Sequence, residues 1–244
     1  MARSAGVPAE AVAQAYKRSL LENGAVARAV EVFGGVDILV NNASAIRLTG
    51  TLDMPVKRYD LMHGVNGRGT FVCAQACLPH LLNSPNPHIL TLSPPLVTDA
   101  KWFKDFPAYT IAKYTMSLFT LALASEFKDR GVAVNSLWPR TAIATAAVRN
   151  EIGGADLIAA CRTPEIVADA AHYILTRPSR DCSGNFFSMT KCYWRLVSGT
   201  SRNTTSRLAL HCRPTSLLRP CRACYGRTPW SRPSRVHDVC NSHT

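Results

Sequence analysis

The sequence predicts an α/β fold built on a parallel sheet, and three observations support this prediction. Short β-branched, apolar runs recur along the first three quarters of the chain. Stretches of helical composition, each of about 12 residues or more, separate these runs, and parallel strands need crossover connections of this kind. The runs are apolar throughout rather than alternating, as in strands that are buried on both faces. The expected strands are residues 36–42, 88–93, 132–138 and, with a weaker pattern, 182–187.

The expected helices lie between these strands and have recognisable ends. Gly34 and Gly35 follow the first helix, at a position where glycine commonly ends one. Pro79, Pro85 and Pro87 are expected to break the chain before the second strand, because proline lacks the amide proton that a continuing helix needs. The helices are expected over residues 8–33, 54–82, 107–129 and 164–176.

Composition and charge divide the chain into two parts. The 244 residues are 47% hydrophobic and 18% charged, which is typical of a globular protein with one core. No apolar run approaches the roughly 18 residues of a membrane-spanning helix, which excludes an integral membrane protein. The net charge of +12 is uneven, because residues 1–187 carry +3 and residues 188–244 carry +9. We therefore expect a folded domain over residues 1–187 and a basic tail over residues 188–244.

The tail is rich in Ser, Thr, Arg, Pro and Cys without any sustained period, so we expect it to be disordered. Cys221 and Cys224 have the spacing of half a zinc site, but His237 and Cys240 do not form a convincing second half, and no metal site is predicted. Nucleic-acid binding is not favoured, because the tail lacks a binding module and has few aromatic residues. The cysteines of the domain lie in apolar or helical context, which is typical of reduced thiols in an intracellular protein.

Tyr109 and Lys113 are the first candidates for chemistry. They are four residues apart on the helix expected over residues 107–129, so both side chains lie on one face. A nearby ammonium favours the phenolate and lowers the pKa of a tyrosine from its usual value of about 10. Tyr109 is therefore a candidate general acid/base for proton exchange with an alcohol or a ketone. Taken alone, such a pair more often marks a solvated helix face.

Polar side chains gather where the expected strands end. Asn41 and Ser93 stand at the ends of the first two strands, Asn66 lies in the helix between them, and residues 135–139 (NSLWP) end the third strand. Ligands of open α/β sheets bind beyond the carboxyl ends of the strands. We therefore expect these residues and Tyr109 to surround one ligand.

The stretches around these residues resemble the short-chain dehydrogenase/reductase family. The matching stretches are VDILVNNAS, VNGRGTF, AYTIAK, VNSLWPRTAI and SGNF, and the resemblance covers about residues 25–187. It implies a Rossmann-like, doubly wound parallel sheet. It also implies hydride transfer between NAD or NADP, with NADP slightly favoured, and a secondary alcohol or ketone of lipid- or steroid-like type. A homo-oligomer and a peroxisomal or mitochondrial location are further implications of the resemblance.

The resemblance assigns roles to individual residues. Tyr109 matches the catalytic acid/base, and Lys113 matches the lysine that lowers the pKa of the tyrosine and holds the nicotinamide ribose. Asn66 matches the asparagine of a water-linked proton relay. Asn41 and Ala43 match cofactor-binding positions.

The remaining candidates lie at the ends of the strands expected over residues 132–138 and 88–93. Pro139 and Thr141 match positions that lie against the nicotinamide. Ser93 matches either the serine that polarises the substrate oxygen or only a strand-end hydroxyl, because Pro94 follows where the family usually has a second serine. Arg140 replaces a usual glycine, which indicates a divergent pocket.

The glycine-rich turn TGxxxGxG, which binds the cofactor pyrophosphate in this family, is missing from the sequence, as are the strands that usually precede residues 36–42. We therefore expect an N-terminally truncated chain with a partial sheet, weak cofactor binding, and an open apolar edge along residues 36–42. Two alternatives to an active oxidoreductase follow. One is a catalytically silent fragment that interacts through this edge, and the other is an adaptor that binds nucleic acid through its basic tail.

Overall fold

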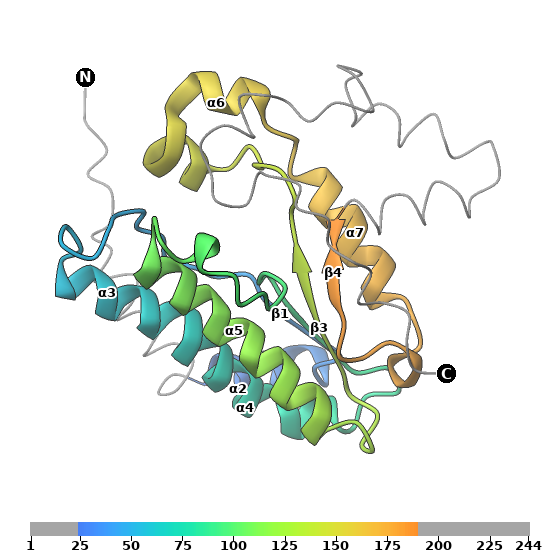
Figure 1. Cartoon of the computed structure of the whole chain (residues 1–244). Coiled ribbons are helices and arrows are strands. Elements are labelled where there is room, and N and C mark those ends of the chain that lie inside the picture. Colours follow the sequence, from blue (N-terminus) through green and yellow to red (C-terminus); the bar gives the residue numbers. More distant parts are fainter. Residues whose placement is uncertain (1–23, 190–244) are drawn as a thin grey trace, which may run out of the picture.

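A parallel sheet of four strands forms the centre of the computed structural model, which describes residues 24–189 except for the side chains of residues 151 and 154–156 (Figure 1). The strands lie in chain order: β1 (Ile38–Asn41), β2 (His88–Thr91), β3 (Ala133–Trp138) and β4 (Phe186–Ser188). In register, Asn41 pairs with Thr91, Thr91 with Ser136, and Ser136 with Phe186. The carboxyl ends of the strands therefore lie along one edge, and the predicted α/β class is confirmed.

Helices cover both faces of this sheet. α2 (Ala25–Phe33), α4 (Gly69–Leu81) and α5 (Pro107–Glu126) lie on one face, and α7 (Glu165–Leu175) lies on the other (Figure 1). The predicted doubly wound arrangement is therefore confirmed.

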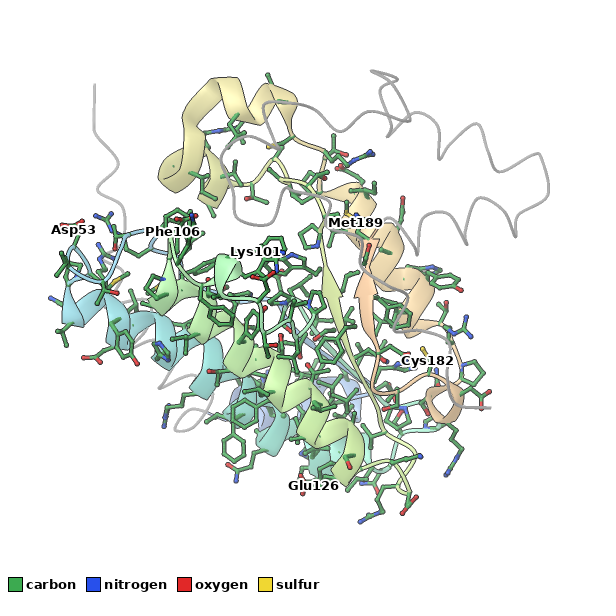
Figure 2. All side chains as sticks on the ribbon, viewed as in Figure 1. Asp53, Lys101, Phe106, Glu126, Cys182 and Met189 are labelled. Atoms are coloured by element: carbon green, nitrogen blue, oxygen red, sulfur yellow. The ribbon has the colours of Figure 1, made fainter. Side chains whose placement is uncertain are left out.

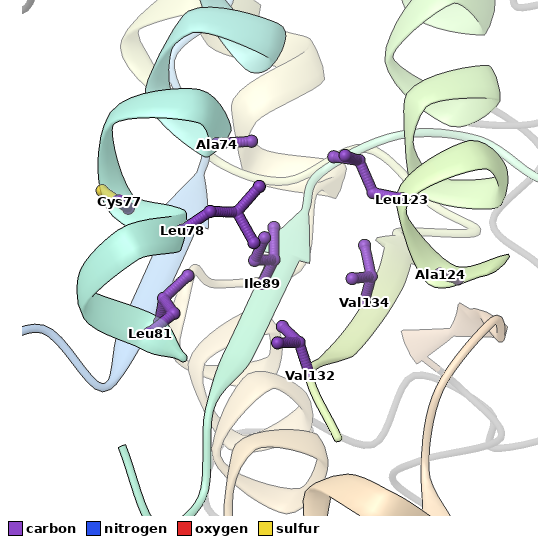
Figure 3. Close-up of a cluster of buried hydrophobic side chains, with 9 residues drawn as sticks. All are labelled: Ala74, Cys77, Leu78, Leu81, Ile89, Leu123, Ala124, Val132 and Val134. Carbon is purple, nitrogen blue, oxygen red and sulfur yellow. The ribbon is translucent and has the colours of Figure 1, made fainter. Parts of the chain in front are cut away.

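Two apolar clusters hold these layers together, one on each face. On the first face, Leu78 of α4 and Leu123 of α5 pack with Ile89 and Val134 of the strands (Figure 3). On the second face, the buried cluster comprises Leu90, Leu137, Ile143, Ile166, Ala170, Ile174 and Met189. Neighbouring residues of β2 alternate between the two clusters, because successive side chains of a strand point to opposite faces.

The helix expected over residues 54–82 is one continuous segment with a local change of pitch. α3 (Val56–His63) leads into a π-helical turn, η1 (Gly64–Arg68), and α4 follows directly. Pro79 lies inside α4, so the prediction that it breaks the chain is wrong. The helix accommodates it at the cost of the one backbone hydrogen bond that proline cannot donate, and α4 ends two residues later, at Leu81.

Other helix ends and short helical segments complete the described chain. Gly34 ends α2 as predicted, with a φ of 83° and its N–H donated to the carbonyl oxygen of Val30. The helical residues after β3 were not predicted, because adjacent glycines interrupt their apolar pattern. The short helical segments of the described chain are η2 (Ala100–Trp102), before α5, and η3 (Val148–Gly153), α6 (Gly154–Ala160) and η4 (Ser179–Asp181), after β3.

Long-range hydrogen bonds join the amino end of β2 to the turn after α7. Asn86, just before β2, donates its side-chain amide to the carbonyl oxygen of Arg177 over 3.2 Å and accepts the backbone N–H of Ser179 over 2.8 Å. His88 Nε2 donates to the same Arg177 carbonyl over 3.0 Å. These bonds join the start of β2 to the turn that follows α7.

The packed domain continues slightly past residue 187. Ser188 is the last residue of β4, and Met189 is buried beside α7 (Figure 2). Within residues 24–189, β1 is an edge strand, and Ile38 and Val40 are 45% and 44% exposed. Residues 8–23 of the first expected helix, and the tail from residue 190 on, lie outside the described residues. None of the described helices is long and apolar enough to cross a membrane.

Candidate active site at the carboxyl edge of the sheet

Tyr109 and Lys113 lie in the first turns of α5, where this helix passes the carboxyl ends of β2 and β3. Pro107 begins the helix, because its fixed φ suits the first helical position. Lys113 is 3% exposed, and its Nζ donates to the carbonyl oxygen of Leu92, just after β2, over 2.6 Å. The same Nζ lies 5.7 Å from the ring centroid of Trp138, at the end of β3. Lys113 is therefore buried and Tyr109 partly buried, so the pair does not lie on a solvated helix face.

Burial dominates the protonation of both side chains. It raises the pKa of Tyr109 to about 12 and lowers the pKa of Lys113 to about 7, because either charged form would lose its hydration. The expectation of a lowered pKa for Tyr109 is therefore wrong for this structure, because burial raises this pKa and the Lys113 ammonium is bonded to Leu92. Tyr109 is consequently a protonated phenol at neutral pH.

Asn66 lies in the π-helical turn η1 and is completely buried. Its Oδ1 accepts the backbone N–H of Ala45 over 2.8 Å, and its Nδ2 donates to the Ala45 carbonyl over 3.1 Å. Its own carbonyl oxygen accepts the hydroxyl of Thr70 over 2.7 Å. π-Helical turns often occur at functional sites. Here the turn directs Asn66 to the loop that follows β1, and the amide holds that loop in place.

Asn41 and Ala43 define the start of the same loop. Asn41 is buried, and its Nδ2 donates to the hydroxyl of Thr91 over 3.5 Å. Its carbonyl oxygen accepts the N–H of Leu92 over 3.0 Å, so this residue joins the ends of β1 and β2. Ala43 is exposed just beyond them.

Ser93 belongs to a buried chain of hydroxyl groups. Its Oγ shares a hydrogen bond of 2.6 Å with the Oγ of Ser136, which in turn shares one of 3.0 Å with the Oγ1 of Thr120 on α5. Ser117 donates to the carbonyl oxygen of Pro94 over 2.6 Å. The hydroxyl of Ser93 is therefore bonded inside the domain, between the sheet and α5, in the manner of a strand-end hydroxyl.

Pro139 and Thr141 follow β3 at the same edge and are partly buried. Thr141 Oγ1 is shielded from water and has no hydrogen-bond partner among the described residues. A buried hydroxyl in this state costs roughly 1–3 kcal/mol, which a bonded ligand would remove. The ammonium of Lys113 and this hydroxyl suit the ribose hydroxyls and carboxamide of a nicotinamide nucleotide, so the residues present fit the expected cofactor.

Some members of this arrangement were not predicted from the sequence. They are Leu92, Ala45 and Thr120, which act through backbone groups or through a buried hydroxyl. Ser136 belongs to the strand end that was expected to border the ligand, but its bonds to Ser93 and Thr120 were not predicted. Among residues 24–189, no group of three or more His, Cys, Asp or Glu side chains could bind a metal ion. The cysteines and histidine considered for zinc lie outside this range.

Comparisons with known proteins identify the family. The model of the enoyl-(acyl carrier protein) reductase family matches residues 21–191. The chain belongs to the short-chain dehydrogenase/reductase family, as its motifs indicated.

Individual relatives narrow the comparison. Hydroxysteroid dehydrogenase-like protein 2 of Danio rerio is 57% identical over 157 residues, which are 64% of this chain and 37% of that protein. The chain thus spans well under half of that relative's length. A solved structure from Xanthomonas campestris, assigned as a dehydrogenase, is 52% identical with a TM-score of 0.70, covering 79% of this chain and 71% of the other. A structure from Beutenbergia cavernae with bound NADP at low occupancy is 25% identical with a TM-score of 0.59, covering 70% and 72%.

Proposed function

We propose that this chain is an oxidoreductase that transfers a hydride between NAD or NADP and a secondary alcohol or ketone, with Tyr109 exchanging the proton. The main observation is the position of Tyr109 and Lys113 on successive turns of α5, with the ammonium held at the end of β2. Family membership supports the reaction class. The similarity to hydroxysteroid dehydrogenase-like protein 2 supports a lipid- or steroid-like substrate.

The protonated state of Tyr109 favours ketone reduction at neutral pH. The bound nicotinamide would supply the hydride to the carbonyl carbon of the substrate. As the C=O double bond becomes single, its oxygen takes the proton from Tyr109 Oη, so the product is a neutral alcohol and Tyr109 is left as a phenolate. The alkoxide is the stronger base, so this transfer is downhill even with the pKa of Tyr109 at about 12. Lys113, one turn away, stabilises the phenolate.

Lys113 and Thr141 are the residues that would hold the nicotinamide half of the cofactor. An ammonium has three N–H groups, so Lys113 can donate to a ribose hydroxyl beside its bond to Leu92. Thr141 Oγ1 would gain the partner that it lacks. Asn41, Ala43 and Pro139 border the same place, and we propose NADP before NAD because the Beutenbergia cavernae structure has NADP bound.

Asn66 and Ser93 enter this proposal as supporting residues. Both hydrogen-bonding ends of the Asn66 amide are used by Ala45, so Asn66 would act by fixing the cofactor-side loop rather than by handling protons. Ser93 would act through Ser136 and Thr120 by fixing α5 against the sheet.

A second candidate function is that of a catalytically silent interaction protein. The specific observation in its favour is the exposure of Ile38 and Val40 on the edge strand β1.

Self-association is proposed for the active protein as well, through the outward face of α4 and α5. That face exposes Phe71, Ile111, Leu118 and Leu121.

A titration of the purified full chain with NADPH and NADH, followed by fluorescence, tests the cofactor step. Reduction of a panel of lipid-like ketones by wild type, Tyr109→Phe and Tyr59→Phe tests the chemistry. Tyr59 is a suitable control because it is 41% exposed on α3 and lies outside the site. We expect saturable binding by all three proteins and a loss of turnover of at least about 100-fold in Tyr109→Phe alone. A folded protein without cofactor binding, or full activity in Tyr109→Phe, would overturn the proposal.

A further inference from the structure

Lys113 is a buried cation with an unusual set of neighbours. The end of β2 contributes the Leu92 carbonyl at 2.6 Å, and β3 contributes the ring of Trp138, whose centroid is 5.7 Å from Nζ. On α5 itself, the titratable neighbours are Tyr114, the next residue, and Tyr109, one turn earlier; burial raises the pKa of both phenols, so both are neutral at neutral pH. Burial is the cause of the lowered pKa of Lys113, and no carboxylate of the described residues offsets it. The positive charge is therefore opposed by burial without a negative partner among these residues.

This situation matters because only the charged lysine can stabilise a phenolate. Burial acting by itself lowers the pKa of Lys113 to about 7, so a large share of the side chain would be neutral at neutral pH. The face of an indole ring attracts an ammonium but not a neutral amine, and indole is the strongest such partner among the aromatic side chains. The Trp138 ring thus favours the charged form.

The geometry that brings the two side chains together is fixed by the fold. Every second side chain of a strand points to the same face, so Val134, Ser136 and Trp138 share the face of β3 that packs against α5. On this face, Val134 joins the apolar cluster and Ser136 bonds to Thr120. Lys113, Ser117 and Thr120 lie along one buried face of α5, at helical spacings of four and three residues. Ser117 bonds to Pro94 beside β2, and Thr120 bonds to β3. The inner face of α5 is thereby attached to both strands, which fixes the backbone of Lys113 relative to that of Trp138.

We propose that Trp138 is a positioning residue that keeps the Lys113 ammonium charged and in place through the face of its indole ring. The consequence for turnover rests on the proposed function, whereas the effect on Lys113 does not. The sequence itself indicates no such role, because the two residues are 25 positions apart and belong to different elements.

The direct test is an NMR titration of the lysine Nζ and Cε resonances of the labelled full chain. The chain has only seven lysines, and the spectrum of Lys113→Arg identifies the resonance of Lys113. We expect Trp138→Leu to lower the pKa of Lys113 by about one unit and Trp138→Phe to lower it less. Trp102→Leu is a matched control, because Trp102 lies 5.3 Å from Nζ of Lys101 in the same kind of pair. It should leave Lys113 unchanged. An unchanged pKa in folded Trp138→Leu would overturn the proposal.

Fluorinated tryptophan provides a second test that does not depend on a substitution that the fold must tolerate. Each added fluorine weakens the attraction of the ring for a cation while the shape of the ring is nearly kept. The pKa of Lys113 should fall stepwise with the number of fluorines if the ring face is responsible. It should stay constant if Trp138 only fills space, and that result would overturn the proposal.

These readouts are independent of the cofactor and of turnover. If Trp138→Leu lowers the pKa of Lys113 but the chain binds neither NADH nor NADPH, the role of Trp138 is supported and the proposed function is contradicted. If the chain binds cofactor and reduces ketones but the pKa of Lys113 is unchanged in Trp138→Leu, the proposed function is supported and the role of Trp138 is contradicted. If both proposals hold, ketone reduction should decline above a lower pH in Trp138→Leu than in the wild type. The difference should equal the change in the pKa of Lys113, and it should be smaller in Trp138→Phe.

Discussion

Asn66 binds both backbone polar groups of Ala45, although the two residues are 21 positions apart in the chain. The bonds are 2.8 Å from the Ala45 N–H to Oδ1 and 3.1 Å from Nδ2 to the Ala45 carbonyl. The side-chain amide thus replaces the partner that a neighbouring strand would provide. It couples the π-helical turn to the loop at the proposed cofactor site.

Asn66→Ala removes both bonds and leaves the backbone groups of Ala45 without their partner. We expect the free energy of unfolding to fall by about 2 kcal/mol, measured by urea denaturation. Asn83→Ala is the matched control, because the Asn83 side chain is exposed and makes a single bond of 3.1 Å to the Pro79 carbonyl. Its cost should stay within about 0.5 kcal/mol. Equal costs for the two variants would contradict the interpretation of Asn66.

Ser93→Ala distinguishes the two roles considered for this serine. The structure places its hydroxyl against Ser136, so we expect a loss of about 1 kcal/mol in the free energy of unfolding with little change in kcat. Ser136→Ala should cost more, because Ser136 also bonds to Thr120. A fall in kcat of about 100-fold with unchanged stability would instead make Ser93 a group that polarises the substrate oxygen.

Gly67→Ala tests how closely η1 approaches α5. A Cβ at this position would lie 2.7 Å from Cγ2 of Thr115, which is too close for a real contact. We expect a loss of about 1–3 kcal/mol in the free energy of unfolding, and a partial recovery when Thr115→Ser removes that methyl group. Gly64→Ala is the control, because nothing lies within 4 Å of the place that its new methyl group would take, and it should be neutral or slightly stabilising.

His88 makes stability depend on pH in a defined direction. Burial lowers its pKa, and the bond from Nε2 to the Arg177 carbonyl opposes this only in part; Nδ1 is buried without a partner among the described residues. The folded state therefore keeps His88 neutral, whereas the unfolded chain binds a proton below about pH 6.5. The contribution of His88 to the free energy of unfolding should be constant above that pH and fall as the pH drops further.

Urea midpoints measured between about pH 8 and pH 5 test this dependence. His88→Gln cannot take up a proton, so its midpoint should fall less steeply below about pH 6.5 than that of the wild type. Parallel curves for the two proteins would show that another group is responsible.

The local sequence was sufficient to predict most of the fold. The β-branched runs of β1, β2 and β3 and the helical spacing of Tyr109 and Lys113 are properties of a few neighbouring residues. Pro79 was misjudged, because a helix can accommodate one proline at the cost of a single backbone hydrogen bond. The segment with η3 and α6 was missed because Gly153 and Gly154 hide its helical pattern.

The electrostatics of the candidate site could not be predicted in the same way. The spacing of Tyr109 and Lys113 indicates a shared face, but the direction of each pKa depends on how deeply tertiary packing buries them. The partner of Lys113 is a backbone carbonyl 21 residues earlier, which no side-chain motif reports. The same applies to Asn66, whose partner is the backbone of Ala45.

The hydrogen bonds between the amino end of β2 and the turn after α7 also bear on the order in which the chain folds. Asn86 reaches Arg177 and Ser179 across separations of 91 and 93 residues. Contacts between such distant residues carry a large loop-closure entropy and form more slowly than local ones. Amide protection of Ser179 therefore arises only after the whole stretch from β2 to α7 has come together. The amino end of the sheet is thus a kinetic marker for completion of the domain.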